Sequence, residues 1–358
     1  MLALVVILCL AQPTQAIASE YNYSITYVFE NRGQTPLELI ESDLTVPLFM
    51  NTSKQIVKVK EASAGYTSET VDVDGNQAAT MTVGRILSPG QSITFTVFYV
   101  IYSEAWSVPG FSLSEAEGSS SIPSTLIDQY TRPSETFMSD DPHIAAKAEE
   151  VVGDADTVLE TLILLVEYVS GETTYYNFEV PRYPNATLSE ETGDCDDQSI
   201  LLISMLRSLG VPAYLQVGIY VHPSISDSQT SWEGHLINTR SGVGWHGWAM
   251  VYVPPWGWVP VDLTLTSEKD GLELLRKAPE YNGNVVSALN VSRQPYIGET
   301  LATRARILGS GLYVTVIDEA EEINGGGLGS EVYLVAGLGL AVMAAIVLMF
   351  VSSRKGSD

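Results

Sequence analysis

The chain has 358 residues and a formal net charge of −25, with 18 lysines and arginines against 43 aspartates and glutamates. This acidity argues against nucleic acid or an anionic lipid surface as a partner, because both are negatively charged. Charged residues make up only 17% of the chain and hydrophobic residues 45%, so the composition is that of a folded protein rather than a disordered polyanion.

Residues 1–18 are predicted to be a secretory signal peptide. Residues 2–10 form a short apolar core, and Ala16 and Ala18 are small residues that suit a cleavage site. No basic residue precedes the core, so the position of the cut stays open. An uncleaved anchor is the alternative, although the apolar run is short for a bilayer span.

Residues 19–105 are predicted to form a β-sandwich module. Short runs rich in β-branched and aromatic residues, such as 92–102, alternate with turns that contain Gly, Pro and Asn. The module contains neither histidine nor cysteine, so we expect structural support rather than chemistry from it. Residues 106–140 are rich in Ser, Pro and Glu and are predicted to be a linker or a segment that wraps the next domain.

Residues 141–280 are predicted to form an α+β domain. The periodicity predicts helices over 143–153 and 157–171, the second capped by Asp154 or Asp156. A third helix, 195–209, has apolar residues around most of its circumference and is therefore expected to be buried. Later segments are expected to be strands of a sheet packed on that helix: 213–221, 235–240, 246–253 and 257–264.

The C-terminal part is predicted to comprise a β-rich extension (281–322), a Gly-rich linker (323–331), a transmembrane helix (332–351) and a tail (352–358). The run 332–351 carries no charge and is long enough to span a bilayer. Arg354 and Lys355 follow it, so the tail is expected in the cytoplasm and everything before the helix outside. Sequons suit an exported glycoprotein and occur at Asn22, Asn51, Asn185 and Asn290.

Cys195 is the one cysteine that remains after removal of the predicted signal peptide, so the exported domain has no internal disulfide partner for it. Asp194 is expected to cap the third helix and to place Cys195 in its first turn. Free backbone N–H groups there favour a thiolate and can hold a developing oxyanion. The neighbouring Asp194, Asp196 and Asp197 have the opposite effect and raise the pKa of the thiol, so a cationic histidine is needed nearby.

Of the four histidines, His246 is the preferred partner for Cys195. Asp262 follows on a strand that is expected to lie beside the strand of His246. His143 is interpreted as a surface residue and His222 as a loop residue, whereas His235 stays an alternative. A cysteine, a histidine and an aspartate are the parts of a thiol acyl-transfer site, in which the histidine moves the proton and the aspartate orients its ring.

The segment 193–213, GDCDDQSILLISMLRSLGVPA, resembles the nucleophile block of the transglutaminase-like (papain-like thiol) superfamily. HGW and the later GWVPVDLT resemble the histidine and aspartate blocks of that family. The resemblance covers about 141–266 and implies Cys195 as nucleophile, His246 as base and Asp262 as the orienting acid. It also implies a core of helices packed on an antiparallel sheet. Met250 departs from the family pattern, because members often carry an acidic residue there.

The resemblance further implies a side chain that completes the oxyanion hole. Tyr175, Tyr176 and Trp232 are the candidates, and Trp248 is a candidate for lining the cleft. Each of these also has an ordinary interpretation as a packing residue.

Together, these features predict a membrane-anchored thiol enzyme outside the cell that attacks a peptide or amide carbonyl and forms a thioester. Hydrolysis is the default outcome, as in a cysteine protease or amidase, with transfer to an amine left open. The expected partners are a protein or peptide substrate at the cell surface and the membrane. No cofactor or metal is expected, because CxxC, HExxH and EF-hand spacings are absent from the sequence. The alternative is a non-catalytic surface module that binds peptide or glycan in the same cleft.

Overall fold

The computed structural model describes residues 18–70, 72–105 and 107–324. The predicted transmembrane helix, the tail and residues 1–17 of the predicted signal peptide lie outside these ranges. Ala18, the last residue of the predicted signal peptide, is the first residue of the first strand in the structure. Within the described ranges, no helix combines the length and the apolar character that a bilayer crossing requires.

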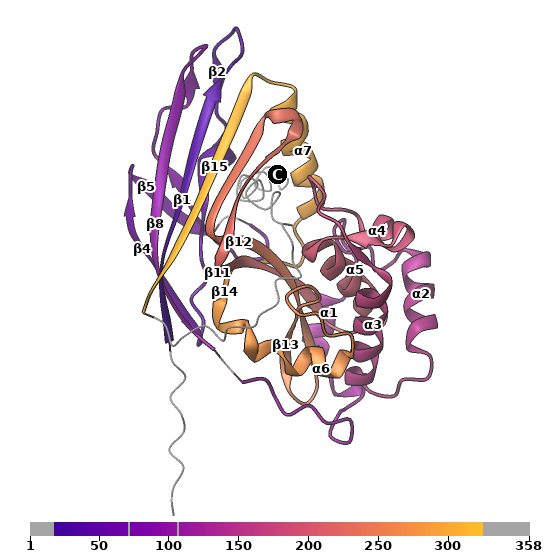
Figure 1. The fold of residues 1–358 in the computed structure, drawn as a ribbon. Coiled ribbons are helices and arrows are strands. Elements are labelled where there is room, and N and C mark those ends of the chain that lie inside the picture. The colour runs from indigo at the N-terminus through magenta and orange to yellow at the C-terminus, as the bar shows by residue number, and fades with distance from the viewer. Residues whose placement is uncertain (1–17, 71, 106, 325–358) are drawn as a thin grey trace, which may run out of the picture.

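One large curved sheet runs through the molecule (Figure 1). Its strands follow the order β14-β11-β12-β15-β1-β8-β4, and β13 adds to β12. The bounds of these strands are β1 (Ala18–Asn31), β4 (Gln55–Ala62), β8 (Ser92–Glu104), β11 (Ala213–Ser231), β12 (Leu236–Val253), β13 (Gly257–Val261), β14 (Val285–Val291) and β15 (Leu312–Asn324).

Strand β15 joins the two halves of this sheet. It pairs antiparallel with β1 on one side and parallel with β12 on the other. The N-terminal strands therefore continue directly into the sheet of the α+β domain. The sequence predicts 19–105 and 281–322 as separate modules, because strand pairing between segments far apart in the chain leaves no local periodicity that would reveal it.

The N-terminal strands carry a second β layer. A three-stranded sheet contains β3 (Thr45–Leu48), β5 (Tyr66–Thr70) and β6 (Gln77–Met81), and a small ladder pairs β2 (Leu37–Glu38) with β7 (Ile86–Leu87). Val46 and Met81 of this layer are buried in the same core as Tyr27 and Phe95 of β1 and β8. Phe49, the residue that follows β3, packs its ring against Tyr23 of β1 and Tyr99 of β8, with centroids 5.5 and 5.3 Å away, so aromatic packing joins this segment to the large sheet.

Helices gather on the opposite side, against the end of the sheet that carries β11 and β12 (Figure 1). Their bounds are α1 (Ser124–Tyr130), α2 (Pro142–Val152), α3 (Val158–Glu172), α4 (Pro184–Glu190), α5 (Cys195–Ser208), α6 (Gly271–Arg276) and α7 (Tyr296–Leu308). Helix α5 contacts α2, α3, α4, β11 and β12, and its residues 195–207 are all buried. The prediction of a buried helix beginning at the cysteine is thus confirmed.

Short elements complete the chain. They are η1 (Glu41–Leu44), η2 (Ser119–Ser121), η3 (Trp232–Gly234), η4 (Ala278–Glu280), η5 (Asn282–Asn284), β9 (Thr174–Tyr175) and β10 (Thr192–Gly193). The cap of α3 is Thr157, whose hydroxyl accepts from the N–H of Glu160 while the Glu160 carboxylate accepts from the N–H of Thr157. The prediction of Asp154 or Asp156 as this cap was wrong, because the Thr–Glu pair satisfies the free N–H groups reciprocally.

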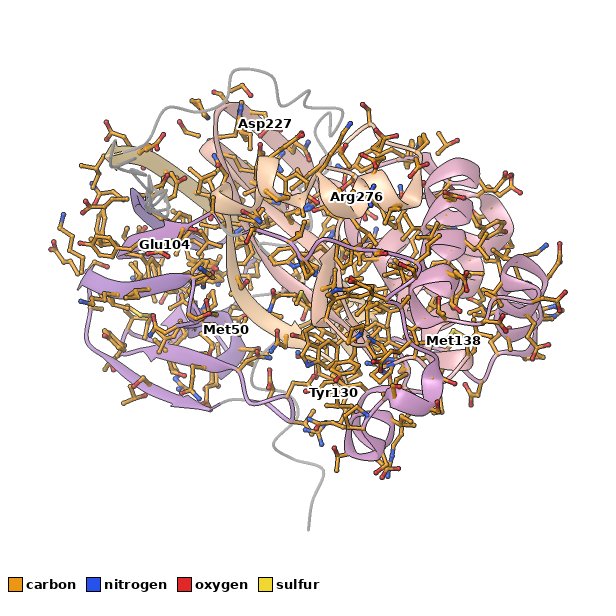
Figure 2. The ribbon with its side chains drawn as sticks, turned by 90° about the horizontal axis from the view of Figure 1, so that it is seen from below. Met50, Glu104, Tyr130, Met138, Asp227 and Arg276 are labelled. Carbon is orange, nitrogen blue, oxygen red and sulfur yellow. The ribbon has the colours of Figure 1, made fainter. Side chains whose placement is uncertain are left out.

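The segment before α2 wraps the helical side of the molecule. The N–H of Glu117 donates to the carbonyl of Pro254, and its own carbonyl accepts from the N–H of Val158. At the end of α1, the ring of Tyr130 packs against Tyr214 and Trp258, with ring centroids 5.4 and 5.0 Å away. Figure 2 shows Tyr130 within this densely packed region.

Candidate active site

Cys195 is the first residue of α5. The Asp194 carboxylate accepts from the N–H of Asp197 at 3.4 Å, and the N–H of Asp194 donates to the Asp197 carboxylate at 3.3 Å. This reciprocal cap ends the extended backbone at Asp194 and starts the helix at the next residue. Cys195 is 3% exposed, so the sulfur lies beneath the surface at the helix N-terminus.

Strand β12 meets the start of α5 at a glycine. The backbone N–H of Gly247 forms a hydrogen bond with the sulfur of Cys195. A Cβ atom on Gly247 would lie 3.0 Å from the Cβ of Asp196 and 3.4 Å from its Cα, so a side chain there would force the helix and the strand apart. The residue before this contact is His246, and β12 therefore brings the imidazole to the region of the thiol.

Asp262 lies one residue beyond β13, which pairs antiparallel with β12. Its Oδ2 lies 2.5 Å from Nε2 of His246, and the two side chains are 4% and 3% exposed. The other oxygen, Oδ1, accepts from the N–H groups of Thr264 and Leu265, both at 2.9 Å. The carboxylate thus holds the imidazole by Nε2, which leaves Nδ1 to exchange a proton elsewhere.

The charge of Asp262 is stabilised by these contacts. Burial opposes ionisation, but the His246 ring and the N–H groups of Thr264 and Leu265 outweigh it and lower the pKa of Asp262. Asp262 therefore carries a negative charge at neutral pH and can stabilise a protonated imidazole beside it.

The thiol of Cys195 has the opposite tendency. Burial and the neighbouring carboxyl groups of Asp194 and Asp196 raise its pKa well above the usual value, and the N–H of Gly247 offsets only part of this. The expected effect of the helix N-terminus is therefore outweighed, and the resting form is the thiol. A thiol in this state needs a base that accepts its proton before or during any attack by the sulfur.

The acidic residues beside Cys195 are held by other parts of the fold. The hydroxyl of Tyr296 donates to Asp196 at 2.8 Å, and the N–H of Arg182 donates to Asp197 at 2.6 Å. Burial, followed by the charge of Asp196, raises the pKa of Asp197, and the N–H groups of Arg182 and Asp194 oppose this rise. Asp194, Cys195 and Asp196 lie close enough together to share a metal ion, but Tyr296 and the helix cap already occupy the two carboxylates.

The other candidate side chains occupy different environments. Trp248 is buried, and its ring stacks on that of His246 with centroids 5.9 Å apart, so it lines one side of the imidazole. Trp232 is fully buried, and its indole N–H donates to the carbonyl of Glu179 at 3.0 Å. Tyr176 is 58% exposed and packs against Phe178.

Tyr175, the residue before the exposed Tyr176, lies close to the start of α5. Strand β9 pairs with β10, and this pairing sets Tyr175 opposite Gly193, two residues before Cys195. Burial above all raises the pKa of the Tyr175 hydroxyl, which therefore stays protonated.

The remaining histidines lie elsewhere in the fold. His235 precedes β12, and its Nδ1 lies 2.8 Å from the carbonyl oxygen of Leu312, while its ring stacks on Tyr313. His222 lies within β11, so its prediction as a loop residue was wrong. His143 is in the first turn of α2 and is exposed, as predicted.

Sequence reasoning missed two contributors to the site. Gly247 is adjacent to His246 in the HGW motif, and its lack of a side chain is the signal that could have identified it. Tyr296 comes from α7, about a hundred residues after Cys195, and no local pattern links the two.

The comparison with known families agrees with this geometry. Residues 145–263 match the model described as the Transglutaminase-like superfamily, and this range contains Cys195, His246 and Asp262. No curated protein sequence matches the chain.

Among solved structures, a candidate cysteine protease from Cytophaga hutchinsonii aligns over 88% of this chain and 93% of its own, with a TM-score of 0.53 and 12% identity. This alignment shows a shared fold. The periplasmic domain of TgpA from Pseudomonas aeruginosa aligns over 70% and 92% of the two chains, with a TM-score of 0.32 and 15% identity. A transglutaminase from red sea bream aligns over 70% and 47%, with a TM-score of 0.31 and 10% identity.

Proposed function

Because residues 145–263 form a transglutaminase-like domain, we propose that the protein is a thiol acyl-transfer enzyme that cleaves peptide or amide bonds with Cys195, His246 and Asp262. One observation carries the proposal: two consecutive residues of β12 contact the predicted nucleophile and the predicted orienting acid. Gly247 binds the sulfur of Cys195, and His246 binds the carboxylate of Asp262. Nucleophile, base and orienting acid are the groups that such chemistry requires.

The reaction would proceed in two steps. His246 accepts the thiol proton at Nδ1 as the sulfur attacks the substrate carbonyl carbon, and backbone N–H groups at the start of α5 stabilise the resulting oxyanion. The imidazolium then returns its proton to the amine, which leaves as the C–N bond breaks and the thioester remains. Water, activated by the same imidazole, cleaves the thioester to a carboxylic acid and restores the thiol.

The raised pKa of Cys195 fits a mechanism in which attack and proton transfer are coupled. A thiol that is protonated at rest reacts when His246 can take the proton, and Asp262 stabilises the imidazolium that forms.

The proposal extends to the location of the enzyme. The apolar run 332–351, followed by Arg354 and Lys355, supports a membrane anchor with a cytoplasmic tail. Together with the export signal expected at residues 1–18, it would place the catalytic domain outside the cytoplasm, where glycosylation of the four sequons and encounter with surface proteins could occur.

Product analysis tests this function. The full chain in detergent is incubated with a peptide library, and the new termini are identified by mass spectrometry. We expect cleavage by the wild type, a transient acyl group on Cys195 and neither with Cys195→Ala. Cleavage by Cys195→Ala at the wild-type rate would refute the assigned nucleophile. Peptide binding without cleavage or acylation would favour a non-catalytic surface module.

A further inference from the structure

A cavity of about 280 Å³ lies between the N-terminal strands and the sheet of the catalytic domain. The start of β4 and the end of β8 supply one wall, which includes Lys54, Gln55 and Glu104. The opposite wall comes from β11, β12 and β14 and includes Tyr214 and Trp248. Figure 2 shows Glu104 on the N-terminal strands. Both halves of the large sheet are therefore needed to form the cavity.

The cavity borders two neighbours of the catalytic histidine. Asp262 and Trp248 both line it, and both contact His246, one through the 2.5 Å hydrogen bond and the other through the stacked ring. Cys195 and His246 are not among its lining residues. A molecule in the cavity would thus touch the supports of the base without occupying the position of the nucleophile.

A lysine and a glutamate form an ion pair in the cavity wall. Nζ of Lys54 and Oε2 of Glu104 lie 3.9 Å apart, and the side chains are 48% and 45% exposed. An exposed ion pair at this separation contributes at most about 1 kcal/mol, so a ligand can separate it at little cost. The pair offers a cation and an anion to a ligand that carries an ammonium and a carboxylate on neighbouring atoms.

The lining combines aromatic and polar side chains. Tyr214, Trp248 and Tyr281 supply ring surfaces, and the amide of Gln216 adds a polar group. Ligand pockets typically measure about 300–1,000 Å³ and are mostly apolar, with a few polar groups that fix orientation. At about 280 Å³, this cavity has room for one amino acid rather than a peptide.

We propose that this cavity is an effector site for a free α-amino acid with an apolar side chain. The carboxylate binds Lys54, the ammonium binds Glu104, and the side chain lies against Trp248 and Tyr281. Because Trp248 and Asp262 contact His246, occupancy changes the rate of acyl transfer. Only this effect on rate rests on the proposed function, since binding requires no turnover.

Calorimetry on the full chain in detergent, with L-phenylalanine and L-leucine as probes, tests the binding. We expect saturable binding of at least one of them, and none of N-acetyl-phenylalanine amide, which has the side chain but neither charge. Lys54→Glu should weaken binding at least about tenfold, equivalent to 1.4 kcal/mol. Combining it with Glu104→Lys should restore binding in part, because the pair is then reversed.

Two further variants locate the site. Lys58→Glu changes the same charge on an exposed position of β4 outside the cavity lining and should leave affinity unchanged. Val285→Trp introduces a large side chain into the cavity and should abolish binding, with circular dichroism as the check on folding. Absence of binding by both amino acids, or unchanged affinity in Lys54→Glu, would overturn the proposal.

The effector site and the proposed function can fail separately. Cys195→Ala should bind the amino acid as the wild type does, although it cannot turn over. Binding in a protein without hydrolytic activity would retain the site and reject the enzyme, whereas hydrolysis at a rate that saturating amino acid leaves unchanged would reject the effector role.

Discussion

The backbone N–H of Gly247 forms a hydrogen bond with the sulfur of Cys195. This contact joins the first residue of α5 to the strand that carries His246, and it depends on the absence of a side chain at Gly247. Asp262 binds His246, the residue that precedes Gly247 on β12. Strand β12 therefore links the thiol of Cys195, the imidazole of His246 and the carboxylate of Asp262.

Gly247→Ala tests this close approach. The new methyl group would lie 3.0 Å from Asp196 Cβ, so α5 and β12 must separate, and such overpacking typically costs about 1–3 kcal/mol. We expect a lower free energy of unfolding and at least tenfold slower peptide cleavage. Gly171→Ala is the control, because nothing lies within 4 Å of a Cβ there and stability should hold or rise. Full stability and activity in Gly247→Ala would show that the helix and strand are not in contact at this point.

Asp262→Asn tests the orientation of the imidazole. An amide can present its NH₂ to Nε2 and favour the other tautomer of His246, and the corresponding change in a serine protease triad lowers kcat about 10⁴-fold. We expect a loss of at least a thousandfold in kcat with a much smaller change in KM, measured on a cleaved peptide. Thr264→Val is the matched control, since it removes only a 3.4 Å hydroxyl contact to the same carboxylate. Comparable kcat values in Asp262→Asn and wild type would mean that another group orients the base.

Asp318→Asn tests the raised pKa of a buried carboxyl on β15, the strand that joins the two halves of the large sheet. Asp318 lies on β15, and its Oδ1 accepts from the hydroxyl of Tyr23 at 2.6 Å and the indole of Trp245 at 3.2 Å. Burial raises its pKa to about 6, against the opposing effects of these two donors and of Arg240. Because the folded pKa is raised, the stability due to Asp318 is fully present below about pH 4 and is lost as the pH rises through 6.

The size of this effect is about 3 kcal/mol for a shift of about two pKa units. Asparagine keeps the acceptor for both donors but does not titrate, so Asp318→Asn should gain stability relative to the wild type as the pH rises from 4 to 7. Urea unfolding at both pH values measures the difference, with Glu321→Gln, an exposed position on β15, as the control. Parallel pH dependence in Asp318→Asn and wild type would contradict the raised pKa.

Arg207→Met tests the interactions that fix the C-terminal end of α5. The buried guanidinium donates to the carbonyls of Ala213, Arg132 and Ser292 and stacks on Phe137, 4.1 Å from the ring centroid. Its removal leaves these carbonyls without their donor, which should cost about 3–5 kcal/mol in the free energy of unfolding. Arg276→Met, at an exposed position, should cost less than about 1 kcal/mol. A small loss in Arg207→Met would show that water or a rearrangement replaces the guanidinium.

Local patterns predicted the helix and the paired strands that carry the candidate site residues. The apolar circumference of 195–209 and the acidic residue before Cys195 were sufficient to predict a buried helix with the cysteine in its first turn, as observed. The spacing between His246 and Asp262 predicted adjacent strands, and β12 and β13 are paired.

Effects that depend on distant residues were not predictable in the same way. The junction through β15 depends on pairing with β1 at the other end of the chain, and the contact of Tyr296 with Asp196 depends on how α7 packs. The balance between the helix N-terminus, burial and carboxylates at Cys195 depends on depth below the surface, which a sequence pattern does not give.

The rate of Cys195 alkylation by iodoacetamide, measured from pH 5 to 10, tests the central claim most directly. In the wild type we expect labelling at neutral pH that is at least about tenfold faster than in His246→Ala, because the imidazole accepts the proton of a thiol whose own pKa is raised. His235→Ala should label as the wild type does. Equal rates in wild type and His246→Ala at every pH would contradict the assignment of His246 as the base for Cys195.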